Sequence, residues 1–160
     1  MPSPRHTKVT LRNKLSRYFR NRRTAQLKAV ILDSANETGS VRLLDLGGRL
    51  EFWQRVGIDF LIDNRIEVTL LNLTEYELGS TDVASAPIHF AVGDACKTDY
   101  PDHSFDLVMS NSVIEHVITW DNMKAFANET RRLGKAYYAQ TPNFWFPIEP
   151  HFYKMPFFHW

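Results

Sequence analysis

Glycines and small polar residues recur at four points in this sequence, each at the end of a short apolar run. They are Asp45 with Gly47 and Gly48, Asn72, Gly93 with Asp94 and Ala95, and Asn111 with Ser112. A glycine lets a ligand approach the backbone without interference from a Cβ atom. Amide and carboxylate groups can bond ribose hydroxyls and the exocyclic amine of adenine. The pattern therefore predicts a nucleoside pocket.

A pair of titratable residues, Glu115 and His116, follows the fourth point. Histidine takes up and releases protons near neutral pH, so His116 is the first candidate for a general base. Glu115 is the second candidate, although on a helix the two side chains can face apart. A structural role for a lone histidine is the alternative. Cys96 is the only cysteine, so neither a disulfide within the chain nor a metal site is expected.

The elements that must position these residues follow from the hydrophobic pattern. Five apolar runs are typical of buried strands, and helical segments lie between them. The predicted strands are residues 41–46, 66–73, 87–92, 104–110 and 135–141, and the predicted helical segments are residues 25–35, 51–56, 114–117 and 121–133, the last with Asp121 as its N-cap. Such alternation predicts an α/β fold, a doubly wound, mostly parallel sheet covered on both faces. Ligands in these sheets bind beyond the carboxyl ends of the strands, where all four points fall.

The composition excludes several other classes of protein. The chain has 160 residues, of which 44% are hydrophobic and 23% charged, as in an ordinary globular domain. No stretch approaches the ~20 apolar residues of a membrane-spanning helix. The basic N-terminus is not followed by the apolar segment of a secretory signal. These features predict a cytoplasmic protein.

The charges are unevenly distributed. Residues 1–32 hold nine Lys and Arg side chains and no acid, whereas the other 128 residues hold ten basic and all 18 acidic side chains. Leu11, Leu15, Tyr18 and Phe19 fall on one face of a helix in this basic segment. Three interpretations stay open. The favoured one is a helix that docks its apolar face on the domain; the others are binding to anionic lipid or nucleic acid, and an organelle transit peptide.

A family resemblance adds to this interpretation. The order LLDLGG, LLNL and GDACKTDYPDHSFDLVMSNSVIEHV resembles class I S-adenosylmethionine-dependent methyltransferases over about residues 41–142, most specifically over residues 101–117. The resemblance implies S-adenosyl-L-methionine as the cofactor. It places Asp45, Gly47 and Gly48 around the methionine moiety and Asn72 at the ribose. It also places Asp94 and Ala95 at the adenine, and Asn111 beside the departing methyl group.

Two positions depart from the family pattern. Arg49 stands where the first motif has its last glycine, and Asn72 stands where the ribose residue is an acid. An amide still bonds a hydroxyl but without charge assistance, so we expect modest cofactor affinity. We also expect an Asn72→Asp variant to bind the cofactor equally well or more tightly, because it restores the acid that is usual in the family. A dinucleotide-binding motif would require a third glycine at position 51, which is Glu51.

The last residues differ from the domain before them. Eight of the 17 residues from 144 to 160 are aromatic and three are proline, so no regular strand is expected there. The family fold adds two strands after the fifth, and the sequence predicts a sheet that is cut short there, with an unpaired edge open to self-association. The tail either packs over this edge or lines the acceptor pocket with Trp145, Glu149 and His151.

The expected organisation is thus a basic amphipathic segment (1–24), a cofactor-binding methyltransferase domain (25–142) and an aromatic tail (143–160). The expected activity is methyl transfer from S-adenosylmethionine to an unidentified, small-molecule acceptor. Binding of nucleic acid or an anionic membrane through the basic segment is not favoured. Two rivals remain: a methyltransferase-like module or fragment that binds without catalysing transfer, and a nucleotide-binding enzyme from another doubly wound family.

Overall fold

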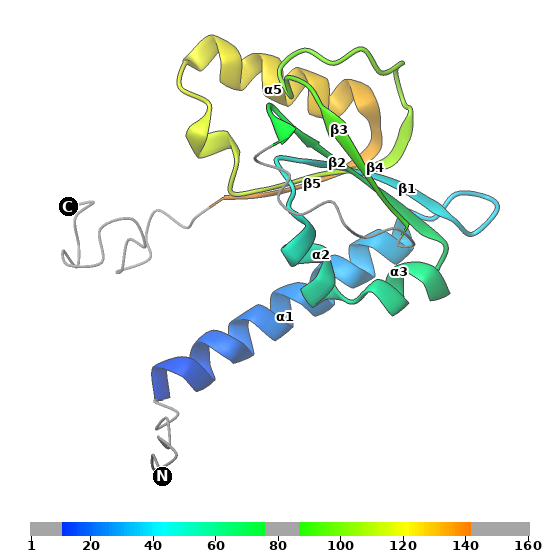
Figure 1. Cartoon of the computed structure of the whole chain (residues 1–160), viewed down its shortest axis with the longest axis vertical. Helices are drawn as coiled ribbons and strands as arrows, with labels where there is room; N and C mark the ends of the chain where they lie inside the picture. The colour runs from blue at the N-terminus through cyan, green and yellow to red at the C-terminus, as the bar shows by residue number, and fades with distance from the viewer. Residues whose placement is uncertain (1–10, 76–86, 142–160) are drawn as a thin grey trace.

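The computed structural model describes residues 11–75 and 87–141, with side chains from residue 18 onward. These residues form a parallel sheet of five strands in the order β3-β2-β1-β4-β5 (Figure 1). The strands are β1 (Val41–Leu46), β2 (Ile66–Asn72), β3 (Ile88–Val92), β4 (Phe105–Asn111) and β5 (Gly134–Gln140). The strand order reverses at β1, between β2 and β4. The doubly wound α/β fold is therefore confirmed, and each strand lies within one residue of its predicted bounds.

Helices cover both faces of the sheet (Figure 1). On one face lie α1 (Leu11–Asp33), α2 (Leu50–Val56) and α3 (Ile58–Asp63), and on the other lies α5 (Trp120–Leu133). Side chains alternate along β1, so that Leu43 joins the core beneath α1–α3 and Leu44 joins the core beneath α5. This two-sided burial explains why the central strands are almost continuously apolar.

The strand register brings the four predicted ligand-binding turns together at the carboxyl ends of the strands. Leu46 at the end of β1 pairs with Leu71 of β2 and with Ser110 of β4. Asn72 at the end of β2 pairs with Val92 at the end of β3. The turns after β1, β2, β3 and β4 therefore leave the sheet side by side, because parallel strands in this register end at nearly the same level.

The N-terminal helical segments differ from the prediction. Residues 11–33 form one continuous helix rather than two, since no helix breaker separates the two segments. Leu27 and Ile31, near its end, are buried against the sheet. Tyr18 and Phe19 are 60% and 49% exposed, so the predicted docking of this apolar face is wrong for these two residues. The early part of α1 projects from the body (Figure 1).

Two further local predictions need correction. The N-cap of α5 is Thr119, whose hydroxyl oxygen accepts a hydrogen bond from the Asn122 N–H at 3.2 Å. Asp121 lies inside the first turn instead, where a negative charge still favours the positive end of the helix. Helix α3 was not predicted, because six residues are too few for a clear helical period. It begins after Gly57, which adopts φ 112°.

Strand β5 is an edge of the sheet within the described residues. Tyr137, on the α5 side, is 63% exposed, whereas Tyr138 packs against the core beneath α1–α3. The predictions for residues 143–160, including Trp145, Glu149 and His151, lie outside the described residues. None of the described helices combines the length and apolar character needed to cross a membrane.

Candidate functional site

The turns after β1, β2, β3 and β4 surround a cavity of about 590 Å³, within the usual range of roughly 300–1,000 Å³ for ligand pockets. Most of the predicted site residues line it: Gly47, Asn72, Asp94, Ala95, Asn111 and His116. Asp45 and Gly48 do not line it but are buried next to it. The structure therefore brings together residues from four segments that are far apart in the sequence.

The turn after β1 is built around the Asp45 carboxylate. Asp45 is 1% exposed, and its Oδ2 accepts a hydrogen bond from Trp53 Nε1 at 2.9 Å. Its Oδ1 has no hydrogen-bond partner among the described residues. Burial raises the pKa of Asp45 to about 7, and the Trp53 hydrogen bond only partly opposes this shift. A Cβ atom on Gly48 would overlap this carboxylate, so residue 48 must be glycine here.

Gly47 lies in the wall of the cavity, in the turn after β1. It adopts φ 74°, a conformation that glycine tolerates and other residues rarely adopt. Its N–H donates to the Leu71 carbonyl at 2.8 Å, which ties the turn to β2. An added Cβ would lie 2.6 Å from Val113 Cγ2. Both the backbone conformation and the close packing therefore require glycine at this position.

Asn72 explains one departure from the family pattern. It is nearly buried, and its Nδ2 donates to the Gly48 carbonyl at 2.7 Å. A carboxylate has no hydrogen to donate and would face this carbonyl unfavourably. The amide therefore holds the glycine turn as well as lining the cavity. This contact changes the expectation for Asn72→Asp, because an aspartate cannot replace the bond.

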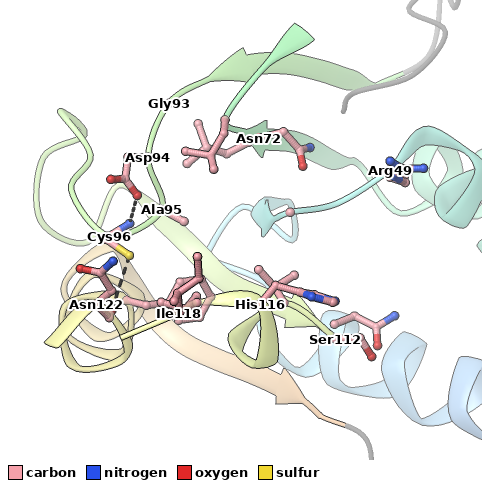
Figure 2. A pocket seen from close by; sticks show the side chains of 17 residues that line it. Arg49, Asn72, Gly93, Asp94, Ala95, Cys96, Ser112, His116, Ile118 and Asn122 are labelled. Carbon is pink, nitrogen blue, oxygen red and sulfur yellow. Dashed lines mark hydrogen bonds between the residues drawn. The ribbon is translucent and has the colours of Figure 1, made fainter. Parts of the chain in front are cut away.

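The turn after β3 is exposed at Asp94, and its backbone N–H groups donate the hydrogen bonds that hold it. The Gly93 N–H donates to the Asn72 carbonyl at 2.9 Å, and the Lys97 N–H donates to the Asp94 carbonyl at 2.9 Å. The Asp94 Oδ1 accepts from the Cys96 N–H at 2.8 Å, which fixes the carboxylate on the cavity wall (Figure 2). Partial burial first, and then the Asp94 charge, raise the pKa of the Cys96 thiol.

The turn after β4 supplies the opposite wall. Ser112 adopts φ 58°, rare for a residue with a Cβ, and its N–H donates to the Gln140 carbonyl of β5 at 2.8 Å. The 3₁₀ turn η1 (Ile114–His116) follows, and His116 lines the cavity (Figure 2). Glu115 is exposed and does not line it. Of the two candidate bases, only His116 is placed on the cavity.

Sequence reasoning missed several lining residues. Cys96 lies one residue beyond Ala95 and Ile118 two residues beyond His116, both of them predicted positions, so proximity along the chain was a usable signal. Asn122 comes from α5, and its backbone carbonyl is 3.5 Å from Cys96 Sγ. No local pattern marks it, since only the packing of α5 brings it to the site. Arg49, noted only as a departure from the family pattern, also lines the cavity.

A second cavity, of about 680 Å³, lies at the opposite end of the strands, beside Val41 and Ile66. Its lining includes Arg42, Arg65 and Glu67. It contains none of the predicted site residues and lies at the amino ends of β1 and β2, away from the edge where such sheets bind ligands. Among the described residues no cluster of three or more His, Cys, Asp or Glu could hold a metal ion.

Comparison with solved structures shows the fold in other proteins. The PH0226 protein from Pyrococcus horikoshii is 22% identical with a TM-score of 0.54, over 83% of this chain and 55% of that chain. A SAM-dependent methyltransferase from Methanosarcina mazei is 16% identical with a TM-score of 0.50, over 68% and 55%. The (4+2)-cyclase SpnF is 22% identical with a TM-score of 0.50, over 69% and 41%. The alignments thus span about half of these three structures.

Comparison with sequence families identifies the chain. The comparison with curated proteins finds no match. A family model described as a methyltransferase domain matches residues 56–136. The matched residues include Asn72, Asp94, Ala95, Asn111 and His116 and begin after the turn that follows β1. With the sheet order and the cavity at the strand ends, this match shows that the chain belongs to the methyltransferase-domain family.

Proposed function

We propose that this chain binds S-adenosylmethionine in the cavity at the strand ends and transfers its methyl group to a small-molecule acceptor. The observation that carries the proposal is the convergence of four strand-end turns on one cavity, in a chain of the methyltransferase-domain family. The SAM-dependent methyltransferase from Methanosarcina mazei, which shares the fold, supports the cofactor class.

The residues present fit such a cofactor. The glycine turn after β1 leaves no side chain between the backbone and the cavity at Gly47. The buried Asp45 carboxyl, one oxygen of which has no partner among the described residues, lies directly behind this turn, where a positively charged group nearby would favour its ionised form. Asn72 supplies an amide for ribose hydroxyls, and Asp94 supplies a carboxylate for an exocyclic amine. Gly47 and Asn111 would then border the methionine end.

The bound cofactor would supply an electrophilic methyl group on a sulfonium. This chain's residues would align the acceptor with that group and exclude water from it. For an alcohol or a protonated acid, an imidazole nitrogen of His116 would take the acceptor's proton. A carboxylate or thiolate acceptor would need no base. The proposed enzyme therefore depends more on positioning than on a set of catalytic groups.

Calorimetric titration with S-adenosylmethionine and S-adenosylhomocysteine tests the cofactor, with ATP and NAD as comparison ligands. Binding of the two adenosyl ligands alone supports the proposal, whereas binding only of ATP or NAD would favour another nucleotide-binding enzyme. Asp94→Asn should weaken binding, and Asp99→Asn, an exposed aspartate outside the cavity lining, is the matched control. Transfer of a labelled methyl group into a cell extract tests catalysis.

A second candidate is a methyltransferase-like module that binds without transferring a methyl group. Two observations favour it. Arg49 occupies a glycine position of the first motif, and a (4+2)-cyclase shares the fold, which shows that the fold alone does not define the reaction. Tight adenosyl binding with no transfer into any extract fraction would select this candidate.

A further inference from the structure

Arg49 lines the cavity at a position where the family pattern has a glycine. It is exposed, and its guanidinium makes no hydrogen bond or ion pair with any other residue that the structure describes. Arginine remains charged at any pH that proteins experience. The substitution therefore adds a permanent cation, available to a ligand, to one wall of the cavity.

The backbone on both sides of Arg49 is held firmly. Before it, Asn72 Nδ2 binds the Gly48 carbonyl at 2.7 Å. After it, α2 begins at once, and Leu50 and Trp53 are 3% and 0% exposed. Arg49 itself has extended backbone angles, φ −127° and ψ 145°, as the N-cap of α2. The base of its side chain is therefore fixed, and only the side-chain torsions remain to be ordered when a ligand binds.

The charges that line the cavity are separated. Figure 2 shows Arg49 and Asp94 at opposite sides of it. Among the described lining residues Asp94 is the only acid, and Arg49 is the only residue with a permanent positive charge. Nothing acidic in the lining therefore neutralises Arg49 where it stands. A guanidinium binds carboxylates and phosphates through two parallel hydrogen bonds.

We propose that Arg49 binds an anionic group, a carboxylate or a phosphate, at its end of the cavity. This inference rests on the proposed function, because the anionic group would belong to one of the two ligands proposed there. One is the amino-acid carboxylate of the cofactor, and the other is an acidic group on the acceptor. In either case Arg49 is a specificity residue, because it selects ligands that carry a negative charge at the end opposite Asp94.

The first test compares two ligands that differ at this end. S-adenosylhomocysteine carries the amino-acid carboxylate, whereas 5′-deoxy-5′-methylthioadenosine keeps the nucleoside and the thioether but lacks it. If the cofactor is the source, Arg49→Gln should weaken binding of S-adenosylhomocysteine at least about tenfold, as expected for loss of a charge-assisted pair. The affinity for 5′-deoxy-5′-methylthioadenosine should change by less than about twofold. Arg55→Gln, on α2 but outside the lining, should change neither.

The second test uses inorganic phosphate as the probe, with and without saturating S-adenosylhomocysteine. If the acceptor is the source, wild-type protein saturated with S-adenosylhomocysteine should still bind phosphate, and Arg49→Gln should abolish that binding while Arg55→Gln keeps it. If saturation with S-adenosylhomocysteine abolishes phosphate binding to the wild-type protein, and Arg49→Gln weakens only S-adenosylhomocysteine, the anion site is assigned to the cofactor. Circular dichroism and the melting temperature check that the variants are folded.

The outcomes separate the two proposals. If neither adenosyl ligand binds the wild-type protein but phosphate binds through Arg49, the proposed function fails and the anion site stands. If Arg49→Gln leaves S-adenosylhomocysteine and phosphate binding unchanged, the anion site is overturned and the proposed function is unaffected. Tighter binding of S-adenosylhomocysteine to Arg49→Gln would also overturn it, because Arg49 would then obstruct the cavity.

Discussion

The turn after β1 and the turn after β3 contribute to the same cavity but are built in different ways. The first contains a buried carboxylate, a glycine that admits no Cβ and a side-chain bond from the neighbouring strand. The second is exposed at Asp94 and is held by local hydrogen bonds of its own backbone. Substitutions in the first turn therefore affect folding and binding together, whereas substitutions in the second report on binding more directly.

The largest expected effect is that of Gly48→Ala. The new Cβ would overlap the Asp45 carboxylate, which is buried beneath Trp53 and cannot move into solvent. We expect a loss of about 4 kcal/mol or more in the free energy of unfolding, an exceptional value for one methyl group. Chemical denaturation measures it.

Gly93→Ala is the matched change in the turn after β3. Its Cβ would meet only Leu71 Cδ1, at 3.2 Å, and a leucine methyl group can shift by a few tenths of an ångström. We expect a cost below about 1 kcal/mol. Equal losses in the two variants would remove the contrast between the turns.

The second-largest expected effect is a pH dependence of the free energy of unfolding, caused by Asp45. The unfolded carboxyl loses its proton near its ordinary pKa of 3.8, whereas the folded one, with its pKa raised by burial, keeps the proton to about 7. Between these values the folded state binds more protons, so the free energy of unfolding falls as the pH rises. From pH 5 to pH 7 the loss should be on the order of 2 to 3 kcal/mol.

Asp45→Asn should remove this slope, because an amide does not titrate and its oxygen can still accept the Trp53 N–H. Urea denaturation of both proteins at pH 5, 6 and 7 measures the difference, and other titrating groups cancel in it. The pKa of Glu129 is held at about 2 by hydrogen bonds from Arg132, so its stabilising contribution is constant above pH 5. Parallel pH profiles would show that Asp45 is charged in the folded protein.

The third effect is that of Asn72→Asp. Without the Nδ2 donor the nearly buried Gly48 carbonyl loses its partner and faces a carboxylate, which should cost about 2 kcal/mol in stability. Binding of S-adenosylhomocysteine should fall as well, because the turn loosens. Thermal denaturation and calorimetry measure the two losses. Unchanged stability would show that the hydrogen bond contributes nothing to the turn.

The smallest effect on folding is expected for Asp94→Asn. The amide oxygen can still accept from the Cys96 N–H, so stability should change by less than about 0.5 kcal/mol. Loss of the charge should still weaken adenosyl binding about tenfold, as for a charge-assisted hydrogen bond that becomes neutral. A large loss of stability would show that this turn, like the one after β1, is part of the folded core.

The strands were predictable because their signal is local. The apolar run of residues 41–46 coincides with β1, and the other strands shift by one residue at most at either end. Helix α3 and the N-cap of α5 were not predicted correctly. A six-residue helix shows no clear period, and Thr119 and Asp121 are both capping residue types, so only the geometry decides between them.

The site was predictable in its location but not in its internal bonds. Glycines and polar residues after the strands indicated the correct edge of the sheet. The burial of Asp45 beneath Trp53 depends on how α2 packs, and the bond from Asn72 to Gly48 depends on the spacing of β1 and β2. The sequence shows neither, because both arise from contacts between elements that propensities and periodicity do not describe.

The projecting helix α1 gives the molecule a large electric dipole moment. Seven Lys and Arg residues lie between positions 11 and 32 without an acid, while the chain after residue 32 carries a net charge of −8. The helix is about 35 Å long and its early part projects from the body (Figure 1), so the early basic residues of α1 lie apart from the acidic residues of the described sheet domain although the net charge is only +1. In the field of a charged surface the molecule turns before it binds. Anion and cation exchangers should therefore both retain it at low salt, through opposite ends.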